Sequence, residues 1–269
     1  MLTFHPQSAL TPIAEQGTTL IELLVAMLSA MVVLGALLAI LEFSTGQETR
    51  ISDKVQADRI GRAAMARVVD ELHSSCTGFG ATAIQAPTST PKSPLLSSGP
   101  ADLWFLSAYG NASSGSAVLT GVIEHDIHWG STGKLSNTGQ TLGTLTDYRF
   151  PSQSGRSPEW KFKELTVANA EARVLAQNVI PQSISGTSTI FQYYRFSSPS
   201  SAEVTQLASG ELPLTTTTAP TVAKVLVGFT QAPETGDTRV GLTVPFQDAV
   251  VLRFTPTETG AEAKNEPCT

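Results

Sequence analysis

Residues 23–41 read LLVAMLSAMVVLGALLAIL, nineteen residues without a charged side chain. At about 1.5 Å of rise per residue, a helix of this length roughly spans the hydrocarbon core of a bilayer. A fully apolar run of this length is uncommon among the buried helices of soluble domains. The stretch therefore predicts a membrane helix, and Glu22, just inside its N-terminal edge, is an ionisable group that needs a partner.

The composition of the chain bounds its class. Of its 269 residues, 41% are hydrophobic and 15% are charged, as in ordinary folded proteins rather than disordered or collagen-like ones. The formal net charge of −6 gives no overall basic field of the kind that a nucleic-acid binder normally carries. We therefore expect a folded acidic protein, for which DNA capture is the less natural role.

Cys76 and Cys268 are the two cysteines of the sequence. They are too few for a disulfide-dense small domain and too far apart for a zinc knuckle with paired ligands. A disulfide between them is the natural use if the domain lies outside the cytoplasm, and closing so long a loop contributes roughly 4 to 5 kcal/mol in the chain-entropy model. Two free thiols are the alternative in a compartment that is not oxidising.

The residues before the apolar run do not fit ordinary secretion. Met1 to Gly17 contains no lysine or arginine, so the basic region that opens a secretory signal peptide is missing. Residues 36–39 offer only a loose cleavage pattern, and no cysteine follows them that could carry the lipid of a lipoprotein. Both export routes are therefore poor fits.

Residues 17–27, GTTLIELLVAM, resemble the prepilin processing motif: a glycine, a short hydrophobic segment and a glutamate five residues after the glycine. The resemblance implies that a prepilin peptidase cuts after Gly17 on the cytoplasmic side, and that Thr18 becomes the methylated N-terminus. It also implies that Glu22 neutralises the N-terminal ammonium of a neighbouring subunit inside a filament. A snorkelling interfacial carboxylate is the alternative interpretation of Glu22.

Past Glu42 the helical pattern becomes amphipathic. We expect one stripe of this segment to meet a globular domain, and Asp58 and Arg62, four residues apart within it, to pair either for subunit docking or as a local surface contact. Cys76 continues the stripe near the predicted helix end. The stripe comprises Ile51, Val55, Asp58, Arg62, Met65, Val69, Leu72 and Cys76.

From about residue 81 onward, short apolar runs alternate with turns rich in Gly, Pro, Ser and Thr, which predicts a mostly antiparallel β domain. The predicted fold class is α+β, with a leader at 1–17, a membrane or filament-core half-helix at 18–43, an amphipathic half-helix at 44–76 and a β-rich extracytoplasmic domain at 77–269. Strands are expected at 103–108, 118–129, 160–167, 190–196, 222–230, 240–244 and 249–255.

The strand at 118–129 carries two histidines that invite a metal-site interpretation. Alternation places His125 and His128 on opposite faces, which excludes them as paired ligands unless a bulge realigns them. Glu124, Asp126 and His128 share the other face, which we interpret as solvated. The sequence therefore predicts no metal site and no cofactor.

No nucleophile elbow, phosphate loop, zinc-protease motif or dinucleotide fingerprint occurs, so the chain is not expected to be an enzyme. With the helix through residues 61–72 and a β-rich region ending in Val250 to Phe254, it resembles minor pilins and pseudopilins of the PilW, GspJ and ComGF type.

That resemblance implies a subunit of a type IV pilus or type II secretion-like filament. Its partners would be a prepilin peptidase, other pilins, a platform protein and, indirectly, an assembly ATPase. The alternatives are a signal-anchored extracytoplasmic enzyme or ligand-binding protein, and an adhesin delivered by the pilin pathway.

Overall fold

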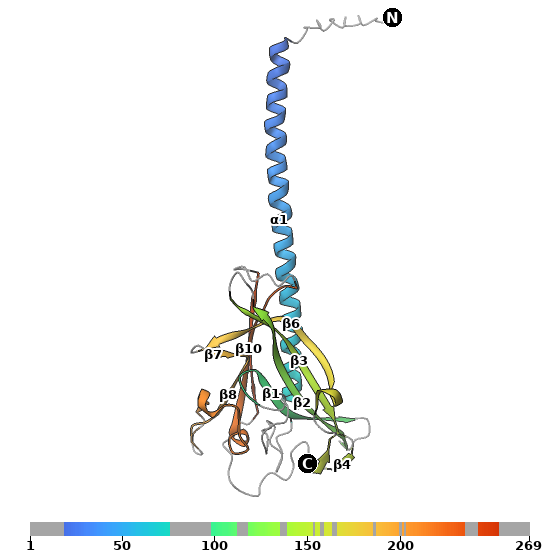
Figure 1. The fold of residues 1–269 in the computed structure, drawn as a ribbon, viewed down its shortest axis with the longest axis vertical. Coiled ribbons are helices and arrows are strands. Elements are labelled where there is room, and N and C mark those ends of the chain that lie inside the picture. The colour runs from blue at the N-terminus through green and yellow to red at the C-terminus, as the bar shows by residue number, and fades with distance from the viewer. Residues whose placement is uncertain are drawn as a thin grey trace, which may run out of the picture. The chain divides into compact units, whose positions relative to one another are not determined.

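The computed structural model describes residues 19–75, 98–111, 118–134, 139–152, 154–156, 159–162, 166–184, 187–198, 201, 203–234 and 242–252. The chain divides into two compact units, Met1–Thr49 and Arg50–Thr269. One helix, α1 (Leu20–His73), runs through the boundary between them. The predicted fold class, α+β with a long N-terminal apolar helix followed by an antiparallel sheet, is confirmed (Figure 1).

Within the first unit, the described residues form the apolar part of α1. Leucine, alanine and methionine dominate this part and favour a helix, while Gly35 and Gly46 have open space where a Cβ would lie. Every large apolar side chain from Leu20 to Phe43 is exposed. This part of α1 therefore has no core of its own, and its stability depends on what surrounds it.

The second unit contains an antiparallel sheet in the order β1-β2-β3-β6-β10-β8-β9, with β11 on β10 and β7 on β6. Strand β10 has β11 along one edge and β8 and then β6 along the other, so it is buried along nearly its whole length. The strands are β1 (Asp102–Asn111), β2 (Val118–Lys134), β3 (Thr141–Pro151), β6 (Glu171–Ile184), β7 (Thr187–Thr189), β8 (Phe191–Phe196), β9 (Val204–Gln206), β10 (Val222–Gln231) and β11 (Val244–Val251).

Smaller elements complete the second unit. Strands β4 (Ser154–Arg156) and β5 (Glu159–Lys161) form a separate two-stranded sheet. Within the described residues, the short 3₁₀ helices η2 (Val167–Asn169), η3 (Ser209–Glu211) and η4 (Ala219–Thr221) lie in the connections. The hydroxyl of buried Tyr193 donates to the carbonyl of Asp102 at 2.6 Å and to that of Gly99 at 3.2 Å, which ties the start of β1 to β8.

The second part of α1 packs on one face of this sheet through a stripe of small and larger apolar residues. Its buried positions are Ala57, Gly61, Ala64, Met65, Val68 and Leu72. The helix comes close to the sheet at Gly61, because a Cβ there would lie 2.0 Å from Cε2 of Phe246 on β11. The helix ends at His73, where the hydroxyl of Ser74 donates to the carbonyl of Glu71 and Ser75 forms an isolated bridge with Ser107.

The predicted helix stripe is partly wrong. Met65 and Leu72 are buried as expected, whereas Ile51, Val55 and Arg62 are exposed. The buried face instead runs through Ala57, Gly61, Ala64 and Val68, each one residue before a predicted position, because Gly61 lets the helix lie against Phe246. Asp58 and Arg62 form the local pair, with 2.8 Å between Oδ2 and Nε, at a site open to solvent where such a contact contributes little.

The strand predictions succeed where the apolar runs are simple. Strands β1, β2, β8 and β10 lie where they were expected. Strands β3 and β6 were missed. Of the strand expected at 160–167, β5 covers residues 160 and 161, residue 167 belongs to η2, and residues 163–165 lie outside the described residues. The predicted strands at 240–244 and 249–255 are instead one strand, β11, within the described residues.

Candidate functional site

The N-terminus of α1 is closed by a capping box. Thr19 donates its backbone N–H to Oε2 of Glu22 at 3.0 Å and its hydroxyl to the same oxygen at 3.2 Å, while the backbone N–H of Glu22 donates to the Thr19 hydroxyl at 3.4 Å. This reciprocal contact satisfies N–H groups that a helix start otherwise leaves free. Glu22 thus has a local partner, which the T-x-x-E spacing could have predicted. Gly17 and Thr18 lie outside the described residues.

The apolar surface that begins at Leu20 is the largest exposed hydrophobic feature of the described residues. Among them, α1 is the one helix whose length and apolar composition suffice to cross a bilayer (Figure 1). A patch of this size rarely stays in contact with water. This helix could span a membrane, which is consistent with single-pass anchoring of the chain.

In the second unit, a polar cluster lies between the last turns of α1 and the face of the sheet that α1 covers. The His125 side chain is fully buried, with Nδ1 2.9 Å from Oδ1 of Asp147 on β3 and Nε2 3.6 Å from Oε2 of Glu71 on α1. Arg67 pairs with Glu71 one turn away. Phe105 on β1 stacks on the imidazole with 5.0 Å between ring centroids, which fixes the ring between the two carboxylates.

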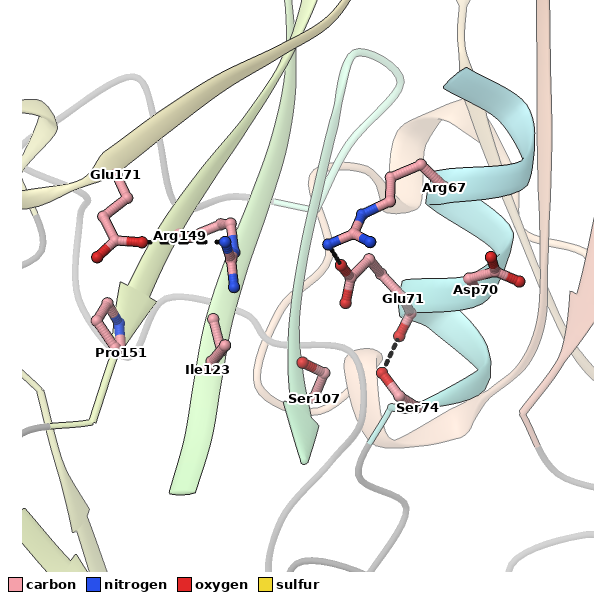
Figure 2. Close-up of a pocket in the computed structure, with 9 residues that line it drawn as sticks. All are labelled: Arg67, Asp70, Glu71, Ser74, Ser107, Ile123, Arg149, Pro151 and Glu171. Atoms are coloured by element: carbon pink, nitrogen blue, oxygen red, sulfur yellow. Dashed lines mark hydrogen bonds and ion pairs between the residues drawn. The ribbon is translucent and has the colours of Figure 1, made fainter. Parts of the chain in front are cut away.

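A cavity of about 560 Å³ opens beside this cluster (Figure 2). Figure 2 shows Arg67 and Glu71 extending from α1 toward the strands, while Arg149 and Glu171 come from β3 and β6. Nη1 of Arg149 is 3.9 Å from Oε2 of Glu171, too long for a hydrogen bond. The remaining lining residues are Asp70, Ser74, Ser107, Ile123 and Pro151.

The cluster does not have the arrangement of a nucleophile and its base. The second imidazole nitrogen of His125 faces a carboxylate of Glu71 and forms no hydrogen bond within the described part of the chain. A catalytic triad would place a hydroxyl or thiol there. What the geometry does provide is a polar contact that joins α1 to β2 and β3 across the core.

The opposite face of β2 was predicted to be solvated, and this is wrong for its two acids. Glu124 and Asp126 are buried. Oε1 of Glu124 accepts a hydrogen bond from the Trp104 indole at 2.5 Å, and His128 contacts Asp102, its cross-strand neighbour, at 2.5 Å. Aromatic cover of a carboxylate depends on strand pairing, so the alternation pattern alone could not predict it.

Burial on this face changes proton affinities. Burial raises the pKa of Glu124 from 4.5 to about 7, against the hydrogen bond from Trp104, which lowers it. The hydrogen bond with Asp102 raises the pKa of His128, against partial burial, which lowers it. For both groups the folded state holds the proton more tightly than the unfolded chain, so the stability that each contributes falls as pH rises through its folded pKa.

Replacing Glu124 with glutamine should therefore stabilise the protein in a pH-dependent way. The variant keeps an acceptor for Trp104 but has no proton to lose, so its free energy of unfolding should match the wild type near pH 4.5 and exceed it by up to about 3 kcal/mol above pH 7. Urea unfolding of the full chain in detergent at several pH values measures this difference. A difference that stays constant from pH 4.5 to pH 8 would show that Glu124 does not titrate in this window.

The other predicted site residues are separated or lie outside the described residues. His125 and His128 point to opposite faces of β2, as predicted. Within the described ranges, no group of three or more His, Cys, Asp or Glu side chains could hold a metal ion. Cys76 and Cys268 lie outside those ranges, so their disulfide remains a prediction.

No family model, curated protein or solved structure matches this chain.

Proposed function

We propose that this chain is a minor pilin or pseudopilin, a filament subunit that α1 anchors in the membrane before assembly. The observation that carries the proposal is the exposed apolar surface of α1 from Leu20 to Phe43, which overlaps residues 17–27, the stretch that resembles the prepilin processing motif. A surface that must be covered on all sides suits a helix that leaves lipid for a bundle of like helices. The packing of the second part of the same helix on an antiparallel sheet is compatible with a pilin-like subunit.

The proposal gives Glu22 two successive partners. In the isolated chain its carboxylate accepts from the N–H and hydroxyl of Thr19. After cleavage behind Gly17, Thr18 would carry an ammonium group, which is costly in an apolar bundle unless a carboxylate lies beside it. Glu22 of one subunit would then exchange its local cap for the ammonium group of the next.

The same proposal assigns partners and location. A prepilin peptidase would cut after Gly17 and methylate Thr18, and other pilins, a platform protein and an assembly ATPase would act in assembly. The N-terminus would be cytoplasmic and the β-rich unit extracytoplasmic, where an oxidising compartment would allow the Cys76–Cys268 disulfide. Filament assembly or initiation, or a role at the tip, would be its function, without catalysis by this chain.

Substitutions at Glu22 test the proposal, because they separate the charge from the cap. Glu22→Gln keeps an acceptor for Thr19 but removes the charge, and Glu22→Ala removes both. We expect both variants to reach the membrane and both to fall at least about tenfold in the sheared filament fraction, since an uncompensated ammonium costs more than 1.4 kcal/mol in an apolar bundle. Quantitative blotting of membrane and filament fractions gives the result.

Glu42→Ala is the matched control, because Glu42 is another exposed acid on the same helix. It should leave incorporation unchanged. If Glu22→Gln assembles like the wild type while Glu22→Ala does not, Glu22 acts only as a helix cap and the charge-pairing part of the proposal is wrong.

A tethered ligand-binding protein is the second candidate function, and the cavity of about 560 Å³ is the observation that favours it. This volume lies in the range of small-molecule sites. The candidate differs from the first in that Met1 would be retained and Glu22 would be replaceable without loss of function.

A further inference from the structure

Strand β11 is an edge of the sheet in the described part of the chain. It pairs with β10 along one side, from Val244 opposite Gln231 to Val251 opposite Lys224, and no described strand pairs with its other side. An eight-residue edge offers a row of free N–H and C=O groups, which is a template for adding a strand from another molecule. If the α1 helices of several copies form a bundle, the β11 edges of those copies come close together.

The direction of each backbone group along β11 follows from one hydrogen bond. The N–H of Leu252 donates to the carbonyl of Ala223 on β10 at 2.8 Å, and the pairing of the two strands shows no register shift. Because backbone groups alternate in direction along a strand, the even-numbered residues of β11 face β10. The outward-facing positions are therefore 245, 247, 249 and 251.

Two of these four outward N–H groups are missing or already occupied. Position 245 is a proline and has no N–H. The N–H of Ala249 donates to Oδ1 of Asp248, its own neighbour, at 2.7 Å. The outward N–H groups of Gln247 and Val251 are thus separated by an occupied one, and Asp248 adds an exposed charge to the edge.

We infer that Pro245 and Asp248 close the outer edge of β11 to strand addition by a second copy of this chain. An added strand needs consecutive outward partners, and here no two consecutive outward N–H groups are free. Proline and charged side chains are the devices by which sheet edges avoid such pairing. Copies of the chain therefore do not pair through the outer edge of β11. This inference goes beyond the proposed function and does not depend on cleavage at Gly17.

Amide hydrogen exchange of the full chain in detergent tests whether Asp248 occupies the N–H group of Ala249. In Asp248→Ala the amide of Ala249 should exchange several-fold faster than in the wild type, because its local acceptor is gone. Asp248 is exposed, so this variant should keep the fold. An unchanged exchange rate at Ala249 would show that Asp248 does not block this N–H group.

The double variant Pro245→Thr/Asp248→Thr tests the consequence. It restores a continuous outward row, so a several-fold rise in oligomers is expected, with exchange at positions 245, 247, 249 and 251 slowing as protein concentration increases. Gln247→Thr, which adds strand propensity without freeing an N–H, and Glu203→Thr, which removes an exposed charge elsewhere, should both behave as the wild type. Wild-type behaviour of the double variant, or concentration-dependent protection of Gln247 and Val251 in the wild type itself, would overturn the inference.

Discussion

Gly61→Ala is expected to lower the free energy of unfolding of the β-rich unit by about 1 kcal/mol. A methyl group at this position would lie 2.0 Å from Cε2 and 2.6 Å from Cδ2 and Cζ of Phe246, so the ring must leave its place against Phe229, 5.7 Å away between centroids. Overpacking of this kind costs about 1 to 3 kcal/mol, which outweighs the gain of about 1 kcal/mol from replacing glycine in a helix. Urea unfolding followed by tryptophan fluorescence measures the loss.

Two further variants identify the cause. Gly46→Ala is the matched control, because no atom lies within 4 Å of the added Cβ, and it should not destabilise the protein. In the Gly61→Ala background, Phe246→Ala should cost less than it does alone, because truncating the ring makes room for the added methyl group. Strictly additive effects of Gly61→Ala and Phe246→Ala would mean that α1 does not approach β11 as closely as described.

Asp147→Ala is expected to lower the free energy of unfolding by about 3 kcal/mol. This is the largest effect that we expect from a single truncation in the polar cluster. It removes the partner of Nδ1 of His125 in a place without solvent, and loss of one member of a buried polar pair costs about 3 to 5 kcal/mol when the pair is charged. Asp147→Asn should cost less, because its amide oxygen still accepts from the imidazole. Chemical denaturation at a single pH compares the two.

Glu171→Ala provides the control for Asp147. The Glu171 side chain is 66% exposed and lies 3.9 Å from Arg149, so its removal should change stability by less than about 1 kcal/mol. Equal losses of unfolding free energy in the two alanine variants would show that the Asp147–His125 contact stabilises the protein no more than the exposed Arg149–Glu171 contact does.

The sequence sufficed for features that depend on long or simple patterns. The uncharged run at 23–41 predicted the apolar helix, and regular apolar runs predicted β1, β2, β8 and β10. Strand β3 was not predicted because shifts in its pairing with β6 break the alternation of buried residues. The buried Leu142 and Leu145, for example, are three residues apart rather than two or four. In β6, Asn178 has a φ of 56° and Pro181 follows, which interrupts any simple strand pattern.

The candidate site was predictable only in its local part. The capping box at Thr19 and Glu22 depends on a spacing of three and could have been found from the sequence. The cluster around His125 could not, because it joins Glu71 of α1 to Asp147 of β3 through a strand register that only the folded sheet defines. Buried Glu124 was missed for the same reason, since Trp104 reaches it across β1 and β2.

The measurement that tests the central claim most directly is the N-terminal residue and intact mass of the membrane-associated protein from its native host, compared with a Gly17→Ala variant. The account predicts a mature chain that begins at methylated Thr18 in the wild type and a leader that is retained in the variant. An intact Met1 in both proteins would contradict prepilin processing and would favour a tethered extracytoplasmic domain.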